Sequence, residues 1–188
     1  MTGPKHQIPF DQFTRLRTRT RGFLPHWEVE GATYFVTYRL HDSLPREVIA
    51  RLKQEYRILS RRAFAISLDR ELDEGRGAAH LRDSRMAAAV AENLHFHRTR
   101  YELEAWCVMP NHVHVVMTPF SGENLEDILH SWKSYTAHQA KKILGVRRLW
   151  AREYYDHIIR SDRELHDTIA YVRRNPAKAG LVNWPWVG

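Results

Sequence analysis

Hydrophobic and polar positions along the chain follow two periods, one typical of strands and one typical of helices. Residues 32–41, ATYFVTYRLH, are rich in β-branched and aromatic side chains and predict a strand. Pro45 then opens PREVIARLKQEYRIL, where apolar residues recur at helical spacing. The charged residues 69–77, DRELDEGRG, predict a loop, and the alanine-rich residues 84–96 predict a second helix.

The second half of the chain predicts a hairpin of two strands, then a long helix, a strand and a last helix. YELEAWCVM and HVHVVMTP are separated by Pro110 and Asn111, a pair that favours a turn. ENLEDILHSWKSYTAHQAKKIL has one apolar helical face. REYYDHIIR predicts the fourth strand. SDRELHDTIAYVRRNP predicts a helix that begins with a capping box, Ser161 with Glu164, and stops at Pro176.

This order of elements predicts an α+β protein with a ferredoxin-like βαββαβ antiparallel sheet, helices packed on one face and an extra C-terminal helix. Residues 31–188 are expected to form this single domain, after a basic, flexible and irregular arm over residues 1–30. Alternate arginines of RLRTRTRG point the same way in an extended chain: Arg15, Arg17, Arg19 and Arg21. Two interpretations stay open for this stretch, a solvated tail or an arm that lies along DNA phosphates.

Composition and charge narrow the classes of partner and compartment. Among 188 residues, 29 Lys and Arg exceed 22 Asp and Glu, which gives a formal net charge of +7. A basic surface predicts a polyanionic partner, nucleic acid before membrane. Cys107 is the single cysteine, so no disulfide framework or cysteine zinc cluster is expected, and a cytoplasmic location fits. No apolar run approaches about 18 residues, so we expect no membrane span, and the N-terminus lacks the apolar core of a signal peptide.

The segment MPNHVHVVM places two histidines one residue apart in an apolar strand. Successive residues of a strand alternate between faces, so His112 and His114 point the same way and can share one divalent cation. Asn111 precedes them at the turn and offers an amide oxygen. The alternative is a pair of hydrogen-bonded sheet histidines without a metal.

The long helix after the hairpin carries a second candidate group. Tyr135 and Gln139 are one turn apart near the apolar face, so both can look at a sheet packed beneath the helix. A tyrosine hydroxyl beside a cation can attack phosphorus, provided that the cation or a neighbour such as Lys142 lowers its pKa from about 10. The alternative for Tyr135 is a half-buried tyrosine whose hydroxyl reaches water.

MPNHVHVVM resembles the HUH motif, histidine–hydrophobic–histidine, of the single-tyrosine HUH endonucleases. Further blocks are similar, in order, to those of the REP-associated tyrosine transposases, bacterial relatives of the transposases of small single-strand insertion sequences. These blocks are GATYFVTYRLHDSLP, CVMPNHVHVVMTP, ILHSWKSYTA, REYYDHIIRSDREL and YVRRNPAKAGLV. The resemblance extends over residues 25–183.

This resemblance implies a metal-dependent endonuclease and strand transferase, a transposase acting on single-stranded DNA. It implies that His112, His114 and Gln139 ligate Mg²⁺ or Mn²⁺. Tyr135 would be the nucleophile, forming a 5′-phosphotyrosine link and freeing a 3′-hydroxyl. The implied substrate is a DNA hairpin of a palindromic repeat. The extra C-terminal block favours a monomer, and the alternative is a homodimer that exchanges the tyrosine helix.

A basic loop with an aromatic residue, VRRLWARE, is a candidate DNA contact. Three arginines surround Trp150, so the arginines can hold phosphates while the indole stacks on a base. Equally open is a solvated loop whose tryptophan packs into the core. The candidate DNA-binding residues outside the N-terminal arm are Lys133, Lys142, Arg147, Arg148, Trp150 and Arg152.

Three other functions compete with the transposase interpretation. The first is a catalytically inactive DNA-hairpin-binding protein of the same fold, against which the joint presence of the histidines, tyrosine and glutamine argues. The second is a metal-dependent phosphodiesterase that uses water, for which Tyr135 is dispensable. The third is an RNA-binding ferredoxin-like domain, which needs stacking aromatics on the sheet face where the histidines lie.

Overall fold

Four antiparallel strands form the central sheet, in the order β4-β5-β3-β6. The computed structural model describes residues 17–20, 23–96 and 99–188. The strands are β3 (Thr33–Leu40), β4 (Tyr101–Val108), β5 (His112–Pro119) and β6 (Trp150–Ile159). Each neighbouring pair is antiparallel. The predicted α+β, ferredoxin-like βαββαβ arrangement is confirmed, with its first and third strands at the centre of the sheet.

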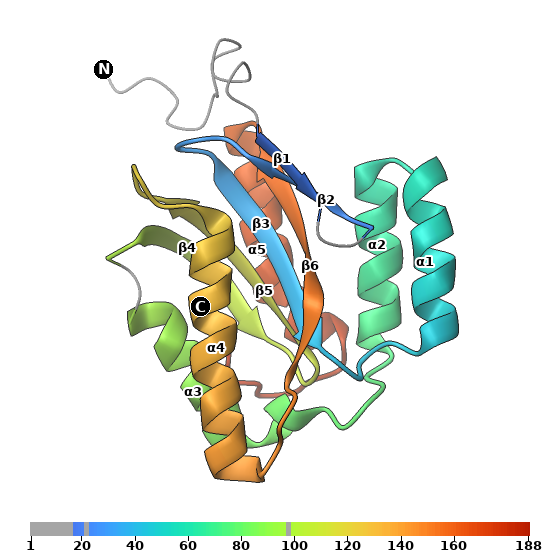
Figure 1. Ribbon diagram of the computed structural model, residues 1–188, viewed down its shortest axis with the longest axis vertical. Helices are drawn as coiled ribbons and strands as arrows, with labels where there is room; N and C mark the ends of the chain where they lie inside the picture. Colours follow the sequence, from blue (N-terminus) through green and yellow to red (C-terminus); the bar gives the residue numbers. More distant parts are fainter. Residues whose placement is uncertain (1–16, 21–22, 97–98) are drawn as a thin grey trace.

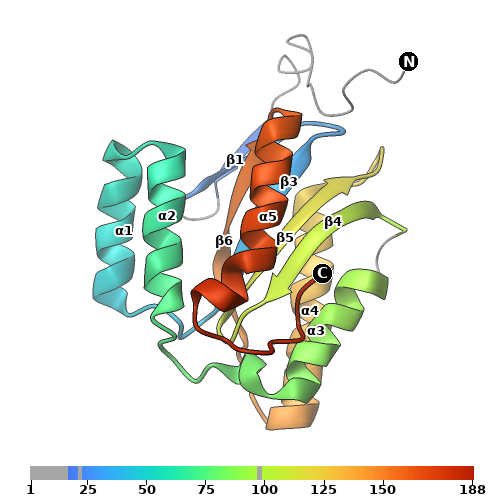
Figure 2. The ribbon, with the colours of Figure 1, turned by 180° about the vertical axis from the view of Figure 1, so that it is seen from behind.

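Helices lie on both faces of this sheet. α3 (Ser84–Phe96) and α4 (Leu125–Leu144) cover one face, and α5 (Asp162–Lys178) covers the other, as Figures 1 and 2 show from opposite sides. α1 (Arg46–Ile58) and α2 (Arg61–Asp73) form a helical hairpin, and Phe64 of α2 contacts Tyr155 of β6. The expected packing on one face therefore applies to the crossover helices α3 and α4, while the extra C-terminal helix takes the opposite face.

Alternation along β5 decides which residues meet which helix. Val113, Val115 and Met117 belong to the core cluster that contains Leu129 and Trp132 of α4, and we call this side of the sheet the crossover face. The Trp132 indole donates to the Tyr101 hydroxyl at 3.0 Å. That hydroxyl in turn donates to the Leu94 carbonyl at 2.6 Å, so one hydrogen-bonded chain joins α4, β4 and α3.

The opposite side of the sheet, which we call the α5 face, has a second apolar cluster. Val116 of β5 and Phe35 of β3 pack there with Val172 of α5. Leu68 and Leu72 of α2 complete the cluster, so both α2 and α5 lie against this face. His112 and His114 share it, because they alternate with the valines of the crossover face.

Two helix boundaries differ from the prediction. The predicted loop over residues 69–77 is wrong in its first part, because α2 continues to Asp73 and buries Asp69 and Glu71. α5 runs through Pro176 to Lys178, so the predicted stop at Pro176 is wrong by two residues; the proline removes one N–H donor near the end of the helix without ending it. The predicted cap is confirmed, because the Ser161 side chain accepts from the Glu164 amide at 3.2 Å.

The N-terminal segment contains a strand pair where we expected irregular chain. β1 (Arg17–Thr20) pairs antiparallel with β2 (Pro25–Glu28). Arg17 and Arg19 lie in β1, whereas the predicted DNA-contacting Arg15 and Arg21 lie outside the described residues. Among the described helices, none combines the length and apolar character that a membrane crossing requires.

Replacing Trp132 by alanine should reduce the free energy of unfolding by about 3–5 kcal/mol, because the indole is fully buried and its hydrogen bond to Tyr101 is lost. Urea denaturation measures this change. Tyr135→Ala, one turn along α4 at a 44% exposed position, is the matched control and should cost less than about 0.5 kcal/mol. Equal losses would contradict the docking of α4 on the crossover face through Trp132.

Candidate active site

Two histidines of β5 lie close together on the α5 face. His112 and His114 are 1% and 0% exposed, and their Nε2 atoms are 3.1 Å apart. Two imidazole nitrogens that each lie about 2.1 Å from one cation, at right angles, are roughly 3.0 Å apart. The pair therefore has the spacing of two ligands of one metal ion.

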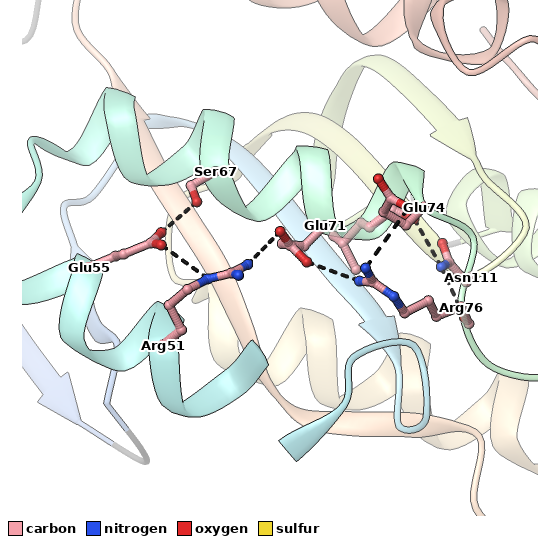
Figure 3. Close-up of polar contacts among 8 residues, drawn as sticks. Arg51, Glu55, Ser67, Glu71, Glu74, Arg76 and Asn111 are labelled. Carbon is pink, nitrogen blue, oxygen red and sulfur yellow. Dashed lines mark hydrogen bonds and ion pairs between the residues drawn. The ribbon is translucent and has the colours of Figure 1, made fainter. Parts of the chain in front are cut away.

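Asn111 fixes the orientation of the first histidine. Its Nδ2 donates to the carbonyls of Leu72 and Arg76 at 3.1 and 3.3 Å, at the end of α2 (Figure 3). The amide oxygen is therefore the group that faces His112 Nδ1, 2.7 Å away. An amide oxygen only accepts, so His112 carries its proton on Nδ1 and its Nε2 lone pair points toward His114.

The second histidine is held from the neighbouring strand. The register of β3 and β5 places Thr37 opposite His114, and the Thr37 hydroxyl lies 2.9 Å from His114 Nδ1. The Phe35 ring stacks on His114, with centroids 5.4 Å apart. Burial lowers the pKa of His112 to about 3 and that of His114 well below its ordinary value. Both rings are therefore neutral at physiological pH, the form that ligates metals.

A tyrosine of α5 faces this pair. The Tyr171 ring centroid is 5.8 Å from that of His114. The Tyr171 hydroxyl donates to Asp69 of α2 and accepts from Asn175 Nδ2, one helical turn later, at 2.9 Å. Burial and the neighbouring Asp69 carboxylate raise the pKa of Tyr171, so its hydroxyl is protonated in this arrangement.

Asp69 joins the tyrosine to the histidines. Its Oδ1 lies 3.8 Å from His114 Nε2, while its other oxygen accepts from Tyr171. Burial raises the pKa of Asp69 to about 7. A cleft of about 550 Å³ between α2 and α5 reaches both Asp69 and Tyr171 and has Arg62 and Arg163 among its lining residues. A ligand can thus approach the tyrosine from solvent.

The structure does not bring Tyr135 and Gln139 to the histidines. Both lie on α4, which packs on the crossover face, and the Tyr135 side chain is 44% exposed. The sheet separates α4 from His112 and His114 on the α5 face. The helical phase indicates that Tyr135 lies at the flank of the apolar face, but it contains no information on which side of the sheet the helix packs.

The predicted DNA-binding residues of the second half occupy the crossover face. Exposed Arg147, Arg148 and Arg152 line a groove of about 430 Å³ between α4 and β6. Lys142 is exposed on α4. Lys133 instead donates to the Ala151 and Arg152 carbonyls at 3.2 and 3.3 Å, and burial lowers its pKa to about 8.

Trp150 packs in the core, which is the second of the two predictions made for this loop, and it does not present its indole for stacking on a base. The residue is 8% exposed and belongs to the core cluster of the crossover face. Its indole nitrogen donates to the Thr136 hydroxyl at 2.8 Å. An indole held on both its apolar and polar edges cannot turn outward to stack on a base without opening the core.

Sequence reasoning missed three residues of the cluster, Tyr171, Asn175 and Asp69. Tyr171 and Asn175 have the same four-residue spacing of a phenol and a side-chain amide that singled out Tyr135 and Gln139, so a signal for them existed in YVRRN. Asp69 had no such signal, because its segment was assigned to a loop.

The potential ligand atoms around His112 and His114 meet only part of the requirements of a hard divalent cation. Two imidazole nitrogens face each other, and amide, carboxylate and phenol oxygens lie near them. Within the described ranges, no three His, Cys, Asp or Glu side chains are already grouped closely enough to hold a metal ion. The histidine pair is therefore an incomplete site that further oxygen ligands must fill.

Comparisons with known proteins identify a family model and relatives of this chain. The family model described as "Transposase IS200 like" matches residues 82–175, half of the chain. A REP-associated tyrosine transposase of Escherichia coli K12 is 28% identical over 90 residues, which cover 46% of this chain and 53% of that protein. A putative REP-associated tyrosine transposase of Haemophilus influenzae is 27% identical over 101 residues, which cover 46% of this chain and 57% of that one. The chain thus spans about half the length of these relatives.

A solved structure shares the fold. It is described as the REP-associated tyrosine transposase bound to a REP hairpin, and it matches with a TM-score of 0.56 at 19% identity. The match covers 86% of this chain and 79% of that one. At this identity the likeness establishes the arrangement of strands and helices.

Replacing Asn111 by alanine should weaken Mn²⁺ binding by roughly 10–100-fold, because His112 loses the acceptor that fixes its tautomer. Isothermal titration calorimetry with Mn²⁺ measures the affinity. Asn124→Ala is the control, since it removes the side-chain cap of α4 and costs about 1 kcal/mol of stability far from the histidines. A similar loss of Mn²⁺ affinity in both variants would mean that Asn111 acts through general stability.

Proposed function

Because the chain belongs to the IS200-like transposase family, we propose that it is a single-tyrosine transposase that cuts and rejoins single-stranded DNA through Tyr171. The observation that carries the proposal is the position of Tyr171 on the α5 face, where its ring centroid lies 5.8 Å from that of His114 and its hydroxyl donates to Asp69. Tyr171 replaces Tyr135 in the role of nucleophile, because the sheet separates Tyr135 from the histidines.

We propose that His112 and His114 hold Mg²⁺ or Mn²⁺ through their Nε2 atoms. Both rings are neutral and oriented, and their Nε2 atoms face each other. A bound divalent cation would polarise the scissile phosphate and stabilise the charge that develops on its oxygens. Gln139, the third ligand that the resemblance implied, is on the wrong side of the sheet for this role.

The reaction is a transesterification that needs no nucleotide cofactor. The Tyr171 oxygen forms a bond to phosphorus and the bond from phosphorus to the 3′ oxygen breaks. The phenol loses a proton and the departing 3′ oxygen gains one, so the step is balanced. The products are a 5′-phosphotyrosine and a free 3′-hydroxyl. Because an ester replaces an ester, a 3′-hydroxyl can reverse the step and rejoin strands. Asn175 holds the phenol in place for the attack.

A single-stranded DNA hairpin of a palindromic repeat is the substrate that we propose. The relatives are named as REP-associated transposases, and the matching solved structure is described as bound to a REP hairpin. The net charge of +7 suits a polyanion. The proposed site draws its residues from β5, α2 and α5 of one chain, which supports a monomer over a dimer that exchanges the tyrosine helix.

Cleavage of labelled hairpin DNA tests the nucleophile. A hairpin with a single-stranded flank, labelled at its 3′ end, is incubated with protein and Mg²⁺ or Mn²⁺ and run on a denaturing protein gel. The wild type and Tyr135→Phe should retain label on the protein, whereas Tyr171→Phe should retain none, because only Tyr171 reaches the histidines. Chelation of the metal by EDTA should abolish the adduct in the wild type and in Tyr135→Phe.

Each other result identifies a different function. An adduct that persists in Tyr171→Phe and is lost in Tyr135→Phe would restore Tyr135 as nucleophile. Cutting by Tyr171→Phe without an adduct would indicate a phosphodiesterase that uses water. Tight hairpin binding without cutting under either metal would indicate the inactive hairpin-binding protein.

We also propose that the groove between α4 and β6 contacts the DNA backbone. Combined alanine substitution of Arg147, Arg148 and Arg152 should weaken hairpin binding and lower the slope of log affinity against log salt by about 2–3. Fluorescence anisotropy at several salt concentrations measures both. The matched control replaces three exposed arginines of the α1–α2 hairpin, Arg46, Arg57 and Arg70, and removes the same charge. Equal effects in the two triple variants would mean that the groove arginines contribute only their net charge and make no specific contact with the DNA backbone.

A further inference from the structure

The carboxylate of Asp69 lies between the histidine pair and Tyr171. One oxygen, Oδ1, faces the edge of the histidine pair, 3.8 Å from His114 Nε2. The other oxygen accepts the hydrogen bond of the Tyr171 hydroxyl. Asp69 is 6% exposed, so its carboxylate is largely withdrawn from water. A buried carboxylate in such a position requires a compensating partner for its charge.

The helix that carries Asp69 is firmly docked. Glu71, two residues later, is buried and accepts from Arg51 at 2.5 Å and from Arg76 at 2.9 Å, which ties α2 to α1 and to the following loop (Figure 3). The Asn111 amide then bonds the end of α2 to the turn before β5. The same amide holds His112, so the position of Asp69 relative to the histidines is fixed by hydrogen bonds on both sides.

Within the part of the chain that the structure describes, Asp69 is the acid recorded within 4 Å of a histidine of the pair, so it can supply an anionic protein ligand to a cation there. Mg²⁺ and Mn²⁺ prefer oxygen donors, and two neutral imidazoles leave the double charge uncompensated. Of the two acids that follow on α2, Glu71 is paired with Arg51 and Arg76, and Asp73 is paired with Lys178 at 2.9 Å. Asp69 Oδ1 lies 3.8 Å from His114 Nε2, a distance that two ligands of one cation can have.

We propose that Asp69 is the third protein ligand of the cation and that the same carboxylate positions the nucleophile. Oδ1 binds the metal beside His112 and His114, and the second oxygen keeps the Tyr171 hydroxyl next to it. This assignment rests on the proposed function. It places a ligand on α2, outside the matched residues 82–175, so the α1–α2 hairpin becomes part of the catalytic unit.

Mn²⁺ binding to the full chain without DNA tests the ligand. We expect Asp69→Asn to weaken Mn²⁺ affinity by at least about tenfold in calorimetry. Electron–nuclear double resonance of the bound Mn²⁺ should show one more water ligand than in the wild type. Asp73→Asn is the matched control, an acid one turn along the same helix, and should change neither the affinity nor the number of waters. In the wild type labelled with ¹³C at aspartate carboxyl groups, a ¹³C coupling to Mn²⁺ should appear.

The ¹³C coupling needs no variant, so a poorly folded Asp69→Asn protein does not remove the test. Absence of that coupling, or equal water counts in Asp69→Asn and Asp73→Asn, would overturn the assignment while the histidine site stands. His114→Ala separates the two proposals, because it should lose Mn²⁺ binding and the ¹⁴N coupling of imidazole. Unchanged Mn²⁺ binding in His114→Ala would instead overturn the metal site of the proposed function itself.

Discussion

The alternation of side chains along β5 is the constraint on which the rest of the molecule depends. Val113 and Val115 point to the crossover face and hold α4 through Trp132. His112 and His114 point to the α5 face, where the Tyr171 ring centroid lies 5.8 Å from that of His114. The two faces of β5 thus have different roles. Its valines stabilise the fold, and its histidines are left for chemistry on the side that α2 and α5 enclose.

Burial of the histidines is tolerable because each ring has a fixed partner. Asn111 accepts from His112 Nδ1, and the Thr37 hydroxyl pairs with His114 Nδ1. A buried imidazole without such a bond would cost about 1–3 kcal/mol. Both partners occupy the Nδ1 side, so the Nε2 atoms are left facing each other. The hydrogen bonds that make the pair tolerable in the core are therefore the same ones that direct its two Nε2 atoms toward a common point.

The sequence allowed prediction of the sheet and of the histidine pair, because a period of two is local information. It also allowed prediction of the Ser161 cap, which depends on residues three apart. The position of the tyrosine could not be derived in this way. Tyr135 and Tyr171 both lie on amphipathic helices with an amide four residues later, and only the packing of α4 and α5 on opposite faces distinguishes them. Asp69 was out of reach because its helix was read as a loop.

The position of α5 explains why the extra C-terminal helix matters. In a bare βαββαβ fold the two crossover helices cover one face and the other face stays open. Here α5 crosses that open face and places Tyr171 above the histidines, while α2 places Asp69 from the side. The cleft between these two helices leads to the tyrosine. A helix that closes the sheet thus also carries the proposed nucleophile, and the face that stays open in the bare fold becomes a cleft between two helices.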